Sequence, residues 1–312
     1  MNLQLQQPLL DGGSLQAGRI DKEIVIAGLA RDCAHSLPRL LPVLEKLAER
    51  FSRRHFIFLE NDSLDRTKEV LQAFAKKHSS CYFDSLDGIG RTYRKRTARL
   101  AYLRNAILQR AEACVADPQH AFLLLLDLDD VNSTVTVDYL VNLVENDTGD
   151  WAGLFANQAD HYYDLWALRH ARLCPDDVWK KVRERPKEMS REDAVARFVT
   201  ALSFSLPPDQ GRVEVESAFG GLGLYRFSAI SGCRYVGLGD DGREVCEHVA
   251  FNEGVRRRGG RLFIDCALIN GRGTEAHAPP RTRWQKWKKR LRKLRVLWER
   301  GRKYDPTLST QG

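Results

Sequence analysis

The chain has 312 residues, of which 43% are apolar and 29% are charged, a composition that is typical of a folded globular protein and excludes a fibrous or disordered one. The formal net charge of +8 is uneven, because residues 281–312 contain 12 Lys and Arg against 2 Asp and Glu, whereas the first 280 residues contain 37 basic and 39 acidic side chains. The near-neutral body argues against a protein that binds nucleic acid over its whole surface.

From residue 24 onward, short apolar runs alternate with segments of helical periodicity. In chain order we expect a strand at 24–29, a helix at 38–51, a strand at 55–59, a helix at 65–77, a strand at 81–86, a helix at 97–115, a strand at 121–126, a helix at 137–146, a strand at 151–157, a helix at 178–202 with a break near Pro186, a Gly-rich apolar segment at 213–227, a helix at 245–258 and a strand at 261–269. This alternation predicts an α/β domain with a mostly parallel sheet flanked by helices.

Four segments are expected along the chain: a loose leader at 1–22, the α/β domain at 23–278, a basic amphipathic helix at 281–303 and a tail at 304–312. The leader lacks the basic region and apolar run of a signal peptide, and no apolar run approaches the roughly 20 residues that span a bilayer. The seven cysteines are odd in number and never spaced as C-x-x-C, which favours a reducing compartment. We therefore expect a cytoplasmic protein.

An acidic cluster, Asp127-Leu128-Asp129-Asp130, follows the apolar run 121–126. Parallel sheets bind ligands beyond the carboxyl ends of their strands, and carboxylates at positions i and i+2 of an extended chain point the same way. Such carboxylates repel one another unless a cation lies between them. We expect Mn²⁺ or Mg²⁺ there, bound directly by Asp129 with Asp127 in support and bridging a nucleotide diphosphate. A surface turn of Asp residues is the alternative, which the preceding buried run disfavours.

Two further segments follow expected strands. Glu60 and Asp62 lie after the second strand, where a carboxylate can accept hydrogen bonds from a nucleobase or a ribose; a helix N-cap is the alternative interpretation. A basic stretch that includes Arg99 and Arg104 follows the third strand. Arginine binds phosphate bidentately, although a solvated helix face would also explain several of these residues. Arg104 lies in the apolar periodic part of the helix, and we expect it to contact the diphosphate or the sugar.

These motifs resemble those of GT-A glycosyltransferases. The segment ENDSLDRT (60–67) resembles their D-D-x-S-x-D-x-T turn, and Asp127-x-Asp129 looks like their DxD motif. Together with RLAYLRN (99–105), YYDLWALR (162–169) and VESAFGGLGLYR (215–226), the set resembles the fungal capsule-associated α-1,3-mannosyltransferase family. The resemblance implies a GT-A domain that transfers mannose from GDP-mannose, with retention, to a glycan or lipid-linked acceptor, as in the synthesis of surface polysaccharides or glycoconjugates.

The resemblance also implies roles for individual residues. Glu60 would contact the base, Arg104 and Asn105 would lie near the sugar diphosphate, and Asp127 and Asp129 would hold the metal. The donor-sugar and acceptor side would be lined by Tyr163, Trp166, Gly220 and Gly221. The donor site is further expected to include Gly28, Arg31, Asp62, Arg99 and Leu128.

Two late residues are candidates for catalysis and metal binding. Glu247, which opens the helix at 245–258, would act as a general base or stabilise the sugar cation, with Asp241 as a nearby rival. In some GT-A enzymes a late histidine completes the metal site, which would assign His277 as a metal ligand. A free surface histidine is the alternative for His277.

The segment 281–303 has Trp284, Trp287, Leu291, Leu294 and Trp298 at spacings of 3, 4, 3 and 4. This spacing forms one helical face surrounded by Lys and Arg, which is typical of an interfacial helix on an anionic membrane. The alternative is a helix that packs on the domain or on a partner chain. If the segment binds a membrane, the protein would be peripheral on the inner face of that membrane.

Two other functions remain open from the sequence. A sugar nucleotidyltransferase would share the fold and the metal, but residues 28–31 lack the Gly-rich, Lys-containing phosphate loop that we would expect after its first strand. A nucleic-acid-binding protein could use 281–303 and 91–104, but the near-neutral body ranks it last, and we expect no nucleic-acid partner.

Overall fold

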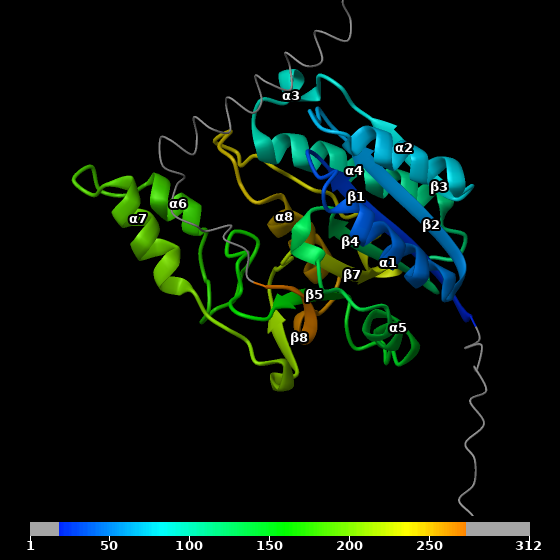
Figure 1. Ribbon diagram of the computed structural model, residues 1–312. Helices are drawn as coiled ribbons and strands as arrows, with labels where there is room; N and C mark the ends of the chain where they lie inside the picture. The colour runs from blue at the N-terminus through cyan, green and yellow to red at the C-terminus, as the bar shows by residue number, and fades with distance from the viewer. Residues whose placement is uncertain (1–18, 273–312) are drawn as a thin grey trace, which may run out of the picture.

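The computed structural model describes residues 19–272 (Figure 1). In this part of the chain, eight strands form one sheet in the order β3-β2-β1-β4-β7-β5-β8-β6. The strands are β1 (Ile20–Ala30), β2 (Phe51–Glu60), β3 (Cys81–Ser85), β4 (Ala121–Asp127), β5 (Gly153–Gln158), β6 (Arg212–Val215), β7 (Leu222–Arg226) and β8 (Leu262–Gly271). The α-helices are α1 (Leu37–Glu49), α2 (Thr67–Lys77), α3 (Ile89–Thr92), α4 (Arg96–Cys114), α5 (Val137–Glu145), α6 (Val178–Arg183), α7 (Arg191–Phe198) and α8 (Glu247–Arg257).

The predicted fold class is confirmed: the sheet is mostly parallel and helices flank it. Strand β1 pairs in parallel with β2 and β4, β2 with β3, and β5 with β8. Strand β7 runs antiparallel between β4 and β5, and β6 runs antiparallel on the edge beside β8. These two antiparallel strands lie in the Gly-rich segment 213–227, for which the sequence predicted no strand.

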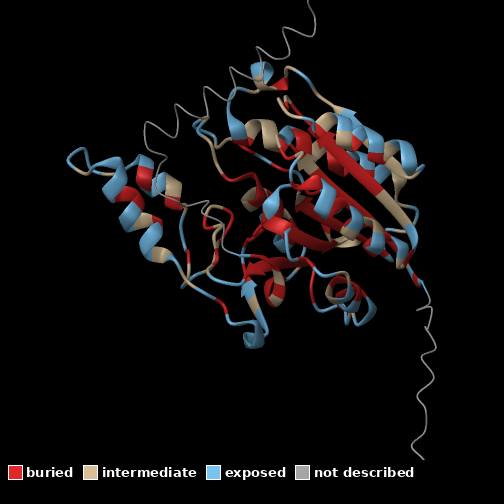
Figure 2. Ribbon diagram, in the orientation of Figure 1, coloured by how far each residue is buried: buried red, intermediate tan, exposed pale blue. Residues whose placement is uncertain are grey.

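Each face of the sheet has its own apolar core, and the alternation of side chains along β1 shows the division. Val25 and Ala27 pack with α4 and α8, whereas Ile24 and Ile26 pack with α1, α2 and α5. Both faces are covered, and the central strands are buried at nearly every position (Figure 2). Their side chains are accordingly almost all apolar.

Several element boundaries differ from the predicted ones. Strand β1 begins at Ile20, inside the expected leader, and β2 begins at Phe51, where a helix was expected. The predicted helix at 178–202 is two short helices, α6 and α7, separated around Pro186. Side chains cap both of them, since Asp177 accepts from the backbone of Trp179 and Ser190 from that of Asp193.

The topology brings the chemically active segments to one edge of the sheet. The carboxyl ends of β1, β2, β4 and β5 point the same way, and β7 starts at that same edge because it runs opposite to β4. The helices α6 and α7 stand beside this edge, away from the layers that cover the sheet (Figure 1). None of the helices in residues 19–272 has the length and apolar character needed to cross a membrane.

Candidate active site

A cavity of about 350 Å³ opens at this edge. It contains nine of the residues that the sequence predicted for the site, namely Arg31, Arg99, Arg104, Asp127, Leu128, Asp129, Tyr163, Trp166 and Glu247. It also contains Asp164 from the segment 162–166 that the resemblance placed on the donor-sugar side, Arg96 from the basic stretch, and His248 next to Glu247. Asn61 and Phe219 line it as well, and the sequence assigned no role to either. These side chains come from segments up to about 200 residues apart in the chain, and the sheet edge is what unites them.

The acidic cluster divides between the cavity and the surface. Asp127 and Asp129 line the cavity, as the i, i+2 spacing predicts. Asp130 lies on the surface instead, where its carboxylate pairs with Nε2 of His35 at 2.7 Å and with Nη2 of Arg39 at 2.8 Å. Two carboxylates of the cluster therefore face the cavity, and the third forms ion pairs on the surface.

The two cavity carboxylates are poorly compensated. Burial raises the pKa of Asp127 to about 7; Arg104 opposes this rise, and the neighbouring charges of Asp129 and Asp164 add to it. Loss of hydration in the cavity also raises the pKa of Asp129, although the backbone N–H of Val131 donates to its carboxylate. A divalent cation between the two carboxylates would relieve this unfavourable charge.

The donor set suits a metal that is shared with a ligand. The described residues contain no group of three or more His, Cys, Asp and Glu side chains placed to hold an ion. Asp127 and Asp129 would thus supply two oxygen ligands, and a bound diphosphate and water would supply the others. His277, the predicted further ligand, lies outside the described residues.

Arg104 lies buried at the back of the cavity and joins three elements. From α4 it pairs with Glu247 at the start of α8, and its Nη2 lies 3.3 Å from Oδ1 of Asp127 at the end of β4. Its guanidinium also lies over the rings of Phe219 and Tyr235, at 5.3 and 5.9 Å from their centroids. Arg104 was predicted to contact the diphosphate or the sugar, and its strongest contacts here are with these two carboxylates.

Arg31, which follows β1, and Arg99 of α4 both line the cavity. Burial, followed by the nearby charge of Arg31, lowers the pKa of Arg99. Arg99 donates to the backbone carbonyl of Tyr93 at 3.0 Å. Two guanidinium groups that repel each other beside two carboxylates form a pattern that suits a diphosphate bridged by a metal ion.

The turn at 60–67 supports the cavity more than it lines it. Glu60 is fully buried and accepts from the backbone N–H of Ser63 at 2.6 Å and from the hydroxyl of Ser85 at 2.5 Å. Burial would raise the pKa of Asp62, but hydrogen bonds from the N–H groups of Gly88 and Gly90 outweigh it and lower that pKa. Of this turn's first three residues, Asn61 is the one that reaches the cavity.

Gly220 and Gly221 shape the site through the backbone. Both have positive φ, and a Cβ atom would lie 2.7 Å from the carbonyl oxygen of Ala156 at Gly220 and 2.6 Å from Val131 at Gly221. The N–H of Gly220 donates to Asp164, and the carbonyl of Gly221 accepts from the N–H of Asp127. The two glycines therefore hold the cavity carboxylates in position and do not line the cavity themselves.

Three other predicted residues do not line the cavity. The amide of Asn105 is occupied by both backbone groups of Tyr235. Asp241 lies exposed in a turn, 3.5 Å from the guanidinium of Arg243. Gly28 lies within the sheet, where a Cβ atom would come within 2.8 Å of β4. Asn105 and Gly28 thus act in packing, and Asp241 contacts Arg243 and is not among the residues that line the cavity.

Buried polar atoms without partners lie around the cavity. Among the described residues, no group hydrogen-bonds to either ring nitrogen of His248, to Nε1 of Trp166 or to Nε of Arg104. Burial, with the charges of Arg104 and Arg96, lowers the pKa of His248 well below its ordinary value. The neutral imidazole stacks on Phe219 with the centroids 3.8 Å apart. Unpaired buried polar groups of this kind are costly to the fold, and they gather next to the cavity.

Comparisons with protein-family models and with curated proteins find no match. Among solved structures, the chain is similar in fold to mannosyltransferase PcManGT from Pyrobaculum calidifontis in complex with GDP-Man and Mn²⁺, with a TM-score of 0.47 and 10% identity over 86% of this chain and 60% of that one. It is also similar to GalNAc-T7 with UDP, GalNAc and Mn²⁺ (TM-score 0.45, 14% identity, 80% of this chain and 44% of that one). A third similar structure is 4-diphosphocytidyl-2C-methyl-D-erythritol synthase (TM-score 0.38, 12% identity, 87% and 98%). The chain thus spans less than two thirds of the first two proteins, and at these identities the likeness describes the fold.

The ion pairs of Arg104 lead to a prediction about stability. Arg104→Met leaves Glu247 and Asp127 without their cation, and we expect it to lower the free energy of unfolding at pH 7 by about 3–5 kcal/mol. Urea denaturation measures this change. Arg110→Met, an exposed site on the same helix that contacts Tyr82, is the matched control and should cost about 1 kcal/mol or less. Equal losses in the two variants would contradict a central role for Arg104.

The raised pKa of Asp127 predicts a pH dependence for the metal-free protein. A carboxyl with a folded-state pKa of about 7 and a lower unfolded-state pKa stabilises the fold at acidic pH, and this contribution is lost as the pH rises from about 4 through about 7. Because Asp127 is partly exposed, we expect a loss of about 1–2 kcal/mol between pH 5 and pH 8. In urea denaturation with EDTA, Asp127→Asn should lack this loss; parallel profiles for both proteins would refute the prediction.

Proposed function

We propose that the protein is a metal-dependent glycosyltransferase of the GT-A type, which moves a sugar from a nucleotide sugar to a glycan or lipid-linked acceptor. The observation that carries this proposal is the pair Asp127 and Asp129, two partly compensated carboxylates at the end of a central strand, in the same cavity as the guanidinium groups of Arg31 and Arg99. This arrangement suits a metal ion and a diphosphate together, as required for a nucleotide-sugar donor.

The described residues would divide the work of binding the donor. Asp127 and Asp129 would hold Mn²⁺ or Mg²⁺, which when bound neutralises the charge that develops on the departing diphosphate. Arg31 and Arg99 would orient the phosphate oxygens. Asn61, with amide donors and an acceptor, reaches the cavity where the base or ribose would lie.

The transfer itself would take place near Tyr163, Asp164 and Trp166. Asp164 accepts hydrogen bonds from the N–H groups of Gly220 and Ala167 and lies close to Asp127. The indole of Trp166 lines the cavity and offers an apolar face for sugar C–H groups. Glu247 would act through Arg104, because the ion pair between them leaves it unsuited to be a free general base.

The finer identity of the reaction rests on the motifs. The resemblance of segments 60–67, 99–105, 162–169 and 215–226 to capsule-associated α-1,3-mannosyltransferases supports GDP-mannose as the first donor to test, and retention as the expected stereochemistry. The basic segment 281–303 lies outside the described residues. Its sequence supports an enzyme that acts at an anionic membrane surface, or an acceptor that lies there.

The metal site gives the decisive test. We expect GDP-mannose, or another nucleotide sugar in a panel, to raise the melting temperature when Mn²⁺ is present and to have much less effect when EDTA replaces it. Asp129→Asn should weaken this binding at least tenfold, because it removes a charged ligand of the ion.

Asp130→Asn is the matched control, since it changes the same side chain one position away, on the surface. It should bind the donor like the unchanged protein. Metal-independent donor binding that Asp129→Asn leaves intact would overturn the proposal. Release of pyrophosphate from a nucleoside triphosphate and a sugar phosphate would instead identify a nucleotidyltransferase.

A further inference from the structure

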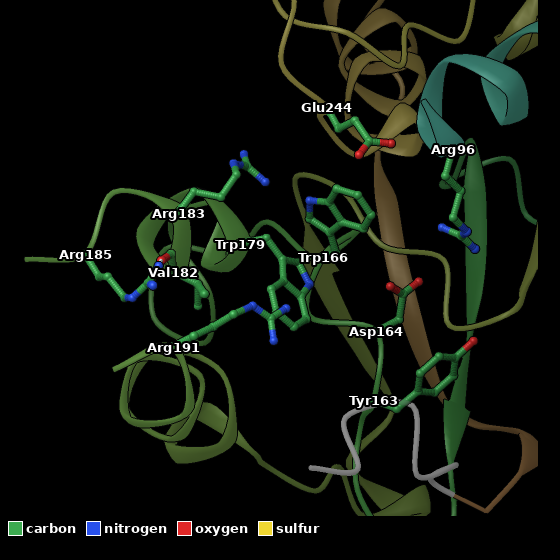
Figure 3. A pocket seen from close by; sticks show the side chains of 10 residues that line it. All are labelled: Arg96, Tyr163, Asp164, Trp166, Trp179, Val182, Arg183, Arg185, Arg191 and Glu244. Atoms are coloured by element: carbon green, nitrogen blue, oxygen red, sulfur yellow. The ribbon is translucent and has the colours of Figure 1, made fainter. Parts of the chain in front are cut away.

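A second cavity, of about 510 Å³, adjoins the first and has a different chemistry. The two cavities share Arg96, Tyr163, Asp164 and Trp166. The second one extends from these residues to the pair of helices α6 and α7, which contribute Trp179, Arg183 and Arg191 (Figure 3). A ligand in this cavity would therefore meet a ligand in the first one at the shared residues.

The second cavity is rich in arginine that has little internal compensation. Among the described residues, Arg96 and Arg191 make no hydrogen bond or ion pair, and the contact of Arg183 is a loose one of 3.7 Å with Asp177. Figure 3 shows Arg183 and Arg191 extending from α6 and α7 on one side, and Arg96 from α4 on the other. Arg185 differs, because it donates to the backbone carbonyls of Val182 and Met189.

The carboxylates of this cavity form no ion pair with Arg183 or Arg191, although the charge of Arg96 acts on Asp164. Glu244 accepts from the backbone N–H and hydroxyl of Thr97. Asp164 accepts from two backbone N–H groups, and burial raises its pKa. Arg183 and Arg191 line the side of the cavity away from Asp164 and Glu244, and neither forms a close ion pair with them, so both guanidinium groups are open to an anionic ligand.

Two indole rings complete the cavity. Trp166 and Trp179 lie between the arginines of α6 and α7 and Arg96 (Figure 3). Indole faces stack on the C–H groups of sugar rings, and arginine forks bind phosphate or carboxylate with two parallel hydrogen bonds. A ligand that matches both features has a sugar or polyol body and an anionic group.

We propose that the second cavity binds the acceptor and selects one that carries a phosphate or a carboxylate. The proposal rests on the proposed transferase function for the role of the ligand, but the binding itself can be tested alone. Arg183 and Arg191 would hold the anion, and the two indoles would place the sugar or polyol so that a hydroxyl reaches Asp164, where the two cavities meet.

Isothermal titration at low ionic strength tests the binding, with glucose 6-phosphate, glucuronate and glucose as probes. We expect at least one of the two anionic probes to bind tenfold or more tightly than glucose, and 0.5 M NaCl to weaken that binding. Preference for glucose 6-phosphate would identify a phosphorylated acceptor, and preference for glucuronate an acidic sugar. Equal affinity for all three probes would overturn the proposal.

Variants show which site the anion occupies. R183Q/R191Q should weaken binding of the preferred anionic probe at least tenfold, whereas Arg197→Gln, an exposed arginine on α7 outside the cavity, should not. Circular dichroism verifies that both variants fold. If the anionic probe binds R183Q/R191Q undiminished, it occupies the metal-side cavity and the proposal fails.

Two further measurements distinguish the anion site from the transferase function and from a membrane-binding role of the same arginines. R183Q/R191Q should keep the Mn²⁺-dependent rise in melting temperature that the donor causes. If the unchanged protein shows no such rise, the result counts against the transferase function and not against the anion site. Vesicles of phosphatidylcholine with phosphatidylglycerol test a membrane role for the same arginines. If R183Q/R191Q weakens vesicle binding and leaves the binding of the anionic probe unchanged, the arginines serve a lipid surface and the acceptor proposal is wrong.

Discussion

The site depends on one buried cation, Arg104. Its guanidinium joins Glu247 at the start of α8 to Asp127 at the end of β4 and lies over two aromatic rings. Breaking a buried ion pair costs several kcal/mol because the remaining charge has no water. Helix α4, helix α8 and the sheet are therefore locked together at the point where the ligand carboxylates must be held.

The antiparallel strand β7 is the second constraint. It lies between β4 and β5 and begins at the turn Gly220-Gly221, which can follow its path because neither residue has a Cβ atom. That turn holds the backbone of Asp127 and the side chain of Asp164. One strand thus fixes a carboxylate of the metal pair relative to the carboxylate where both cavities meet.

The sequence predicted the parts of the fold that depend on local patterns. Continuous apolar runs identified the central strands, and the periodicity of Leu40, Leu44 and Leu47 identified the buried face of α1. The short strand β7 escaped, because its glycines hide the strand pattern and its partners lie about 70 to 100 residues earlier. The direction of β7 follows from packing across the sheet, which no local window contains.

The site was predictable where charged residues directly follow a buried strand, and unpredictable where they come from short helices far along the chain. Asp127 and Asp129 were found because they end a buried run. Arg183 and Arg191 were missed because each is an exposed residue at the end of a short helix, and only the tertiary arrangement places them in one cavity.

The two adjoining cavities differ in the sign of the charge that each lacks. Next to the sheet, Asp127 and Asp129 are two carboxylates that Arg104 compensates only in part. Beside α6 and α7, Arg183 and Arg191 are two exposed guanidinium groups that have no close carboxylate partner. If the two sets lay closer, they would pair with each other and neither would select a ligand. Tyr163 and Trp166 line both cavities and keep the sets apart. Tyr163 and Trp166, which follow β5, therefore separate the two charged sets in addition to offering rings for stacking. A metal ion and an anionic ligand could thus bind in adjoining cavities.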